Sequence, residues 1–287
     1  MREKVRVCLF AVLGGLLLVQ AVVWVSFLRD QRDLAQLMNS IASPNLPPSS
    51  QAQALLAYLR EKPPQTNRSF FLHPAFRFLR ASAREVSVGG GNCADRSRFV
   101  VVMLELHGIH ASKWALYSPD LRPAHAVVEL DSEQGKMVVD PLYGLWFPRS
   151  GGGYYSISDL QQDPDILVVR LRELRALQAQ PGTEPLERYP LNRYVYTHSR
   201  TINWDKSVIT HDLYAVLHSV LGERLNKLSR PEWAEQPAIM LLLLISGIEA
   251  ALLLGIIFLG FITNRARPPS PLKNLQDFGK KNHRVSV

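Results

Sequence analysis

The chain has 287 residues, a formal charge of +8 at pH 7 and two cysteines, Cys8 and Cys93. Two apolar segments, 7–28 and 238–262, each exceed the roughly 20 residues that cross a bilayer core, so neither is available for a soluble core. About 200 residues remain between them, enough for one globular domain. Most of the positive charge lies at the two ends of the chain, which argues against a nucleic-acid-binding surface.

The first apolar segment is predicted to be an uncleaved anchor. Its apolar run is too long for a signal peptide, and no small-residue cleavage site follows it. The flanks on one side of both segments are basic, with a net charge of +2 over residues 1–6 and +5 over residues 264–287. Since basic flanks stay on the cytoplasmic side, both termini are predicted to be cytoplasmic.

These observations predict a bacterial inner-membrane protein whose main domain is periplasmic. The predicted parts are a cytoplasmic N-terminus at 1–6, a transmembrane helix at 7–28, a periplasmic domain at 29–236 with its core at 50–160, a second transmembrane helix at 237–263 and a basic cytoplasmic tail at 264–287. Membrane lipid is therefore an expected partner, and other inner-membrane subunits are candidate partners. Nucleic acid is not expected.

Within the periplasmic segment, helical patterns come first and strand patterns follow, which is typical of an α+β fold. Apolar periodicity predicts helices at 51–62, with Ser50 as the N-cap, at 74–86, and from Asn92 or Cys93 to about residue 107. The later elements are predicted as strands at 113–117, 125–130 and 136–139, a glycine- and aromatic-rich loop at 143–155, and helices at 157–160, 165–177 and 212–228.

Cys93 stands where a helix is predicted to begin, directly after three glycines and Asn92. The positive end of the helix dipole favours the thiolate, which is the reactive form of cysteine. Gly91 and Asn92 are predicted to shape the cleft, with backbone N–H groups left as oxyanion donors. Because Cys8 lies in the first apolar segment, Cys93 has no intramolecular disulfide partner in the domain. The alternative is that Cys93 is a small buried apolar residue.

His125 and Asp140 supply the other groups of a candidate catalytic site. They are predicted on neighbouring strands joined by a short turn, across from one another on one face. An imidazole there would pair with the Cys93 thiolate, and the carboxylate would orient the ring. Asp95 and Arg96, in the first turn after Cys93, either shape the cleft or lie in solvent.

The order and spacing of these motifs resemble the transglutaminase-like (papain-related) superfamily. The residues that carry the resemblance are Gly91-Asn92-Cys93, Leu106-His107-Gly108-Ile109, His125-Ala126 and Val139-Asp140-Pro141. It covers residues 89–143 and implies a cysteine-protease-type fold, with helices packed on a small antiparallel sheet. It also implies thiol-dependent attack on peptide, isopeptide or amide substrates. Val127 departs from the family pattern, which often has a tryptophan there, and His110-Ala111-Ser112 stands where Pro-Ala-Arg is common.

The predicted function is a membrane-anchored thiol hydrolase or acyltransferase with a Cys93–His125–Asp140 triad and a peptide, amide or acyl-bearing substrate. The alternative is a weakly active or inactive transglutaminase-like module that binds within an envelope or exopolysaccharide assembly complex, because a fold does not determine activity. No cofactor and no metal ion are expected. His211 and His218 lie seven residues apart, but a metal site there would need a third ligand.

Each apolar segment contains one residue with a strongly polar end group, Gln20 in the first and Glu249 in the second. Counted from the cytoplasmic ends, both lie ~20 Å deep at 1.5 Å per residue. Gly247, Ala251 and Gly255 form a ridge of small residues that favours close helix packing. We therefore predict that the two spans pack together with Gln20 hydrogen-bonded to Glu249. The alternative is that Glu249 faces another membrane subunit.

Overall fold

The structure is a computed structural model that describes residues 2–63, 81–120, 122–175, 189, 194–202, 204, 208–228 and 230–265. The chain divides into two compact units, one made of Met1–Val23 with Leu242–Val287 and the other of Trp24–Leu241. Two long helices, α1 (Arg2–Ile41) and α8 (Pro237–Arg265), contribute residues to both units.

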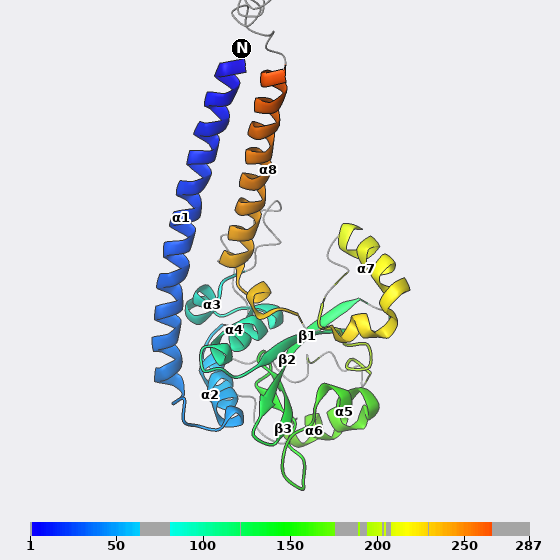
Figure 1. Cartoon of the computed structure of the whole chain (residues 1–287). Helices are drawn as coiled ribbons and strands as arrows, with labels where there is room; N and C mark the ends of the chain where they lie inside the picture. The colour runs from blue at the N-terminus through cyan, green and yellow to red at the C-terminus, as the bar shows by residue number, and fades with distance from the viewer. Residues whose placement is uncertain are drawn as a thin grey trace, which may run out of the picture. The chain divides into compact units, whose positions relative to one another are not determined.

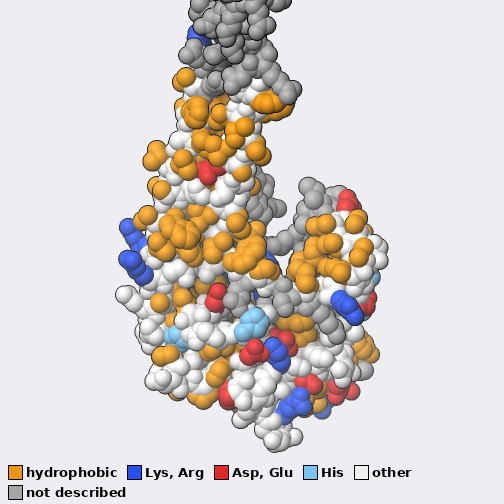
Figure 2. Space-filling model, viewed as in Figure 1, with side chains coloured by type: hydrophobic (Ala, Val, Ile, Leu, Met, Phe, Trp, Pro, Cys, Tyr) orange, Lys and Arg blue, Asp and Glu red, His pale blue; other side chains and the backbone are white. Residues whose placement is uncertain are grey.

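The first unit consists of the N-terminal part of α1 and most of α8. By length and composition these two helices could cross a membrane, over Val7–Ile41 and Pro237–Phe261. Hydrophobic side chains cover their exposed surfaces, as Figure 2 shows. Leu18 and Leu254, for example, are 71% and 67% exposed. Such surfaces are unfavourable in water and suit a hydrocarbon environment, in which helices satisfy their own backbone polar groups.

The second unit contains a four-stranded antiparallel sheet in the order β1-β2-β3-β4. Its strands are β1 (Ala111–Tyr117), β2 (Pro123–Ser132), β3 (Gly135–Asp140) and β4 (Leu145–Trp146). The first three are each two to four residues longer than the predicted strands. Strand β4 lies within the segment predicted as a loop, because two residues are too few to show an alternating pattern. The predicted α+β class is confirmed.

One face of the sheet is covered by helices (Figure 1). They are α2 (Pro48–Arg60) and α4 (Cys93–Glu105), and α3 (Ala83–Gly89) packs against α4. Alternation along β2 and β3 directs Val128 and Val139 into this core, where they join Leu55 of α2 and Phe99 of α4. Each such fully buried side chain contributes about 1.5–3 kcal/mol. Helix α4 is therefore held firmly against the sheet.

The other face of the sheet forms a second core. Val127 and Val138 point to this face and pack with Leu160 and Leu167. The last two belong to α5 (Ile157–Gln162) and α6 (Asp165–Arg175). His125 and Asp140 have the same strand parity as Val127 and Val138 respectively, so they belong to this face as well.

The remaining elements lead to α8. They are α7 (Val208–Leu221) and the 3₁₀ helices η5 (Gly222–Lys227) and η6 (Glu232–Glu235). The helix predicted at 212–228 therefore begins earlier than expected and changes to 3₁₀ geometry at Gly222, whose φ is 58°. That left-handed conformation interrupts an α-helix.

Two helix starts also differ from the predictions. Helix α2 begins at Pro48 with Pro47 at the N-cap position, so Ser50 lies inside the helix. Proline at the first helical position is favoured because its missing N–H would have no partner there. In the described part of the helix predicted at 74–86, a new helix begins after Ser82, which forms a capping box with Glu85. Residues 74–80 lie outside the described residues.

Candidate active site

Cys93 is the first residue of α4, as the local sequence predicts. Asn92 is the N-cap, and its Oδ1 accepts a hydrogen bond from the backbone N–H of Asp95 at 3.1 Å. This bond satisfies one of the N–H groups that a helix start leaves unpaired. The side chain predicted to shape the cleft is thus used to define the helix start and to fix the backbone at Cys93.

The glycines before Cys93 are not free oxyanion donors, contrary to the prediction. The N–H of Gly90 closes the end of α3, and the N–H of Gly91 donates to Pro63 O at 3.3 Å. The other candidate donors are the N–H groups of Cys93 and Ala94, which precede the first intrahelical bonds of α4. Both residues line a cavity, so these groups are placed to stabilise an oxyanion there.

Steric contact, rather than a role as oxyanion donors, explains why Gly90 and Gly91 are glycines. Gly90 has a φ of 75°, and a Cβ added to it would lie 2.0 Å from Pro63 O. A Cβ added to Gly91 would lie 2.7 Å from Asp95 Cβ. Both positions therefore need glycine so that the chain can pass closely between α3 and α4.

His125 and Asp140 are joined by a hydrogen bond of 2.7 Å between Nε2 and Oδ2. Asp140 is fully buried, and its Oδ1 accepts from the N–H groups of Leu142 at 3.1 Å and Tyr143 at 3.2 Å. Both carboxylate oxygens are thus held. Because Nε2 is occupied by Asp140, Nδ1 is the ring nitrogen that remains for Cys93, whose nearby thiol also favours the charged form of the imidazole.

The two side chains share a face but are diagonal neighbours. Val128 pairs with Val139, so the same register continued by one step places Val127 opposite Asp140. His125 is two residues beyond Val127 on the same face. The prediction of a directly facing pair is therefore replaced by a diagonal one, which the imidazole is long enough to bridge.

The surroundings of His125 favour its charged form. Burial by itself lowers the pKa of the imidazole, but the charge and hydrogen bond of Asp140, assisted by Cys93, outweigh it and raise the pKa to about 10. At neutral pH the ring is therefore an imidazolium. A positive ring beside a half-buried thiol is the arrangement that stabilises a thiolate.

Aromatic rings enclose the imidazole. Tyr143 and Tyr189 present edges to it, with ring centroids at 5.3 Å and 5.7 Å. The hydroxyl of Tyr189 shares a hydrogen bond of 3.0 Å with that of Tyr196. These rings exclude water from the His125–Asp140 pair, which strengthens its electrostatics. The sequence predicted no role for Tyr189 or Tyr196, because they lie in a stretch without periodicity.

Arg96 is completely buried, so the alternative that it lies in solvent is excluded. Its guanidinium donates to the carbonyls of Gly91 at 3.0 Å and Pro141 at 3.4 Å. These carbonyls belong to the chain just before Cys93 and just after Asp140. Arg96 thereby ties the nucleophile segment to the carboxylate segment, with the several donors of one planar group.

A cavity of about 310 Å³ opens beside Cys93 and His125. Of the residues that the structure describes, the charged ones in its wall, apart from His125, are Arg98, Lys113 and Arg230. Val127, which replaces the tryptophan common in the resembled family, does not line it and is buried in the second core. The substrate-sized space next to the thiol is thus lined by basic side chains that the sequence did not single out.

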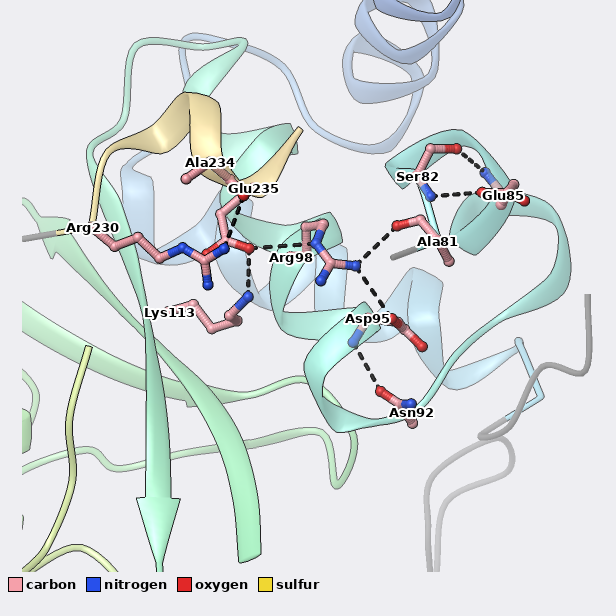
Figure 3. Close-up of polar contacts among 10 residues, drawn as sticks. All are labelled: Ala81, Ser82, Glu85, Asn92, Asp95, Arg98, Lys113, Arg230, Ala234 and Glu235. Carbon is pink, nitrogen blue, oxygen red and sulfur yellow. Dashed lines mark hydrogen bonds and ion pairs between the residues drawn. The ribbon is translucent and has the colours of Figure 1, made fainter. Parts of the chain in front are cut away.

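The three basic residues converge on Glu235 (Figure 3). Its carboxylate lies 3.4 Å from Arg98 Nε, 2.5 Å from Lys113 Nζ and 3.1 Å from Arg230 Nη1. Asp95 adds a contact of 3.2 Å to Arg98. Burial raises the pKa of Glu235, but Lys113, Arg230 and Arg98 outweigh it and lower the pKa to about 2. These four residues, Arg98, Lys113, Arg230 and Glu235, are called the Glu235 cluster below.

The predicted polar pair of the apolar helices also lies together. The Gln20 side-chain amide is 2.8 Å from Ser246 Oγ. With the amide turned so that its nitrogen faces Glu249, Gln20 donates to Oε2 at 3.0 Å and accepts from Ser246. The predicted ridge is not at this contact, since a Cβ added to Gly247 or Gly255 would meet nothing within 4 Å.

No family model matches the chain, and no match is found among curated proteins or solved structures. The site is therefore defined by its own chemistry. It combines a thiol at a helix start, an imidazole bonded to a buried carboxylate, and a cavity that reaches both.

Proposed function

We propose that this chain is a membrane-anchored thiol hydrolase or acyltransferase that attacks amide or peptide bonds. Cys93 is the nucleophile, His125 its acid–base partner and Asp140 the group that orients the imidazole. The observation that carries the proposal is the 2.7 Å bond from His125 Nε2 to Asp140, which leaves Nδ1 for Cys93 beside the cavity. A nucleophile, a base and an orienting acid in contact form the triad arrangement of covalent catalysis.

The chemistry follows from these positions. The Cys93 thiolate attacks the substrate carbonyl carbon, and the carbonyl oxygen becomes an oxyanion near the N–H groups of Cys93 and Ala94. The C–N bond breaks as His125 transfers its Nδ1 proton to the leaving amine, which leaves a thioester on Cys93. Water or a second nucleophile then attacks the thioester carbon and gives its proton to His125. The thiolate departs with the electron pair of the C–S bond.

The resemblance to the transglutaminase-like superfamily supports this proposal. The nucleophile begins a helix, and the imidazole and carboxylate follow on antiparallel strands, in the order described for residues 89–143. On that resemblance the substrate is a peptide, isopeptide or amide. The basic flanks of the two apolar helices support a two-span arrangement in the bacterial inner membrane, with the domain in the periplasm.

Alkylation of Cys93 in isolated membranes tests the proposal. A Cys8→Ala background leaves one thiol in the chain. We expect rapid labelling by iodoacetamide, complete loss of labelling in Cys93→Ala, and a rate about 10²-fold lower in His125→Ala, as removal of an acid–base partner typically causes. If Cys93 reacts at the same rate in the native protein, in His125→Ala and after denaturation, the proposal is overturned. The assembly-module alternative then becomes the better description.

A further inference from the structure

Among the described residues, one wall of the cavity beside Cys93 is lined by basic side chains and by no acidic one. Arg98, Lys113 and Arg230 line the cavity, whereas Asp95 and Glu235, the acids that contact them, do not. An anion that entered the cavity would therefore meet cationic groups first. A wall of one charge sign in a low-dielectric pocket selects the opposite sign in a ligand.

The single carboxylate of Glu235 contacts three basic side chains. Within the described chain it is the one carboxylate that contacts Lys113 or Arg230, and Arg98 takes a further share of it. The side chains of Lys113 and Arg230 are only 10% and 20% exposed, so solvent compensates them weakly. A cation in such a place is costly unless an anion is near. Burial also lowers the pKa of Lys113 well below its usual value, and a bound anion would oppose this shift by stabilising the ammonium form.

The catalytic groups do not supply the missing negative charge. A Cys93 thiolate and a His125 imidazolium neutralise each other. The charge of Asp140 is taken up by His125 Nε2 and by two backbone N–H groups. The basic wall is therefore available to bind a negatively charged group of the substrate.

We propose that Lys113 and Arg230, with Arg98 behind them in the Glu235 cluster, form a subsite for a carboxylate of the acyl substrate. This inference rests on the proposed function and narrows its substrate class to amides or peptides with a carboxylate next to the reacting carbonyl. One carboxylate would compensate the positive charge that Lys113 and Arg230 share with Glu235. A guanidinium such as that of Arg230 can bind a carboxylate through two parallel hydrogen bonds. A cavity of about 310 Å³ has room for one side chain of this size.

Two alkylating reagents that differ only in charge test the subsite in the full-length Cys8→Ala protein. Iodoacetate carries a carboxylate where iodoacetamide carries a neutral amide. In both reactions the Cys93 sulfur forms a bond to the CH₂ carbon and iodide leaves. We expect Arg230→Gln to lower the rate with iodoacetate about tenfold, the effect of losing one charge-assisted hydrogen bond, and to leave the rate with iodoacetamide unchanged. Arg230→Lys keeps the charge and should retain most of the preference.

The control is Arg149→Gln, which removes the same charge from an arginine that is 45% exposed and does not line the cavity. It should leave both rates unchanged. The subsite is overturned if Arg230→Gln lowers both rates equally, or if its ratio of iodoacetate to iodoacetamide rates matches that of the parent protein. Failure of the proposed function looks different, because Cys93 would then react slowly with both reagents and His125→Ala would change neither rate.

Discussion

Asp140 and Glu235 are both buried acids close to the same cavity, but they are compensated in different ways. Asp140 has one titratable partner, His125, and two backbone N–H donors. Glu235 has three basic partners and no backbone donor in the described contacts. The first acid is bound to a group whose proton can move, whereas the second is bound mainly to permanent charges.

This difference separates reactivity from stability. The proton on His125 is available for transfer because Asp140 holds the ring without taking the proton away. Glu235 stands two residues before Pro237, where α8 begins, and binds residues of α4 and β1. It therefore anchors the chain that enters α8 to the centre of the domain. Substitutions at the two acids should affect different measurements.

The largest effect is expected for stability in Glu235→Leu. Removal of one partner from a buried ion pair leaves uncompensated charges and costs about 3–5 kcal/mol. The free energy of unfolding, followed by circular dichroism in detergent micelles, measures this loss. Glu173→Leu is the control, because its pair with Arg170 is 57% exposed at the acid and should contribute less than about 1 kcal/mol. Equal losses in the two variants would contradict the anchoring role of Glu235.

Asp140→Asn should act on reactivity. The amide lacks the charge that holds His125 as an imidazolium, so alkylation of Cys93 at neutral pH is expected to slow about 10²-fold. Asp131→Asn, on the same hairpin but 52% exposed, is the matched control and should alkylate at the parent rate. An Asp140→Asn rate equal to that of the control would show that the bond to His125 does not tune the thiol.

The two acids should also produce stability losses at opposite ends of the pH scale. The pKa of Glu235 is lowered from 4.5 to about 2, so its contribution is present above pH 4.5 and is lost as pH falls through about 2. The pKa of His125 is raised from 6.5 to about 10, so the contribution of its pair with Asp140 is full below pH 6.5 and is lost as pH rises through about 10. Unfolding free energy measured against pH should lose its acid slope in Glu235→Gln and its alkaline slope in His125→Ala. Unchanged slopes would refute the assignments.

The smallest effect is expected at Glu249, a buried acid whose described partners are neutral. Gln20→Leu removes the amide next to it, and hydrogen bonds between membrane helices average about 0.6 kcal/mol. Disulfide crosslinking between cysteines placed on α1 and α8 should become slightly less efficient than in Val22→Leu, a change at a position that is 66% exposed. If Gln20→Leu lowered the free energy of unfolding as much as Glu235→Leu does, Glu249 would depend on Gln20 far more than a neutral partner allows.

The sequence by itself determined the α+β order, the two apolar helices and the local frame of the site. Glycines and Asn92 mark the start of α4, and a period of two marks the strands. His125 and Asp140 are only 15 residues apart on one hairpin, so strand parity sufficed to place them on one face. Local rules work there because each relation spans one helix end or one turn.

Only the tertiary structure decided how the site is supported and what lines it. Lys113 and Glu235 are 122 residues apart, and no local pattern connects them. Arg96 is in the first turn of a helix, where an arginine is usually solvated, and is buried because the distant carbonyls of Lys62 and Pro141 converge on it. Tyr189 reaches His125 from a stretch without periodicity. The physical reason is the same in each case: compensation of a buried charge depends on which groups meet in space, and that is settled only when the whole chain packs.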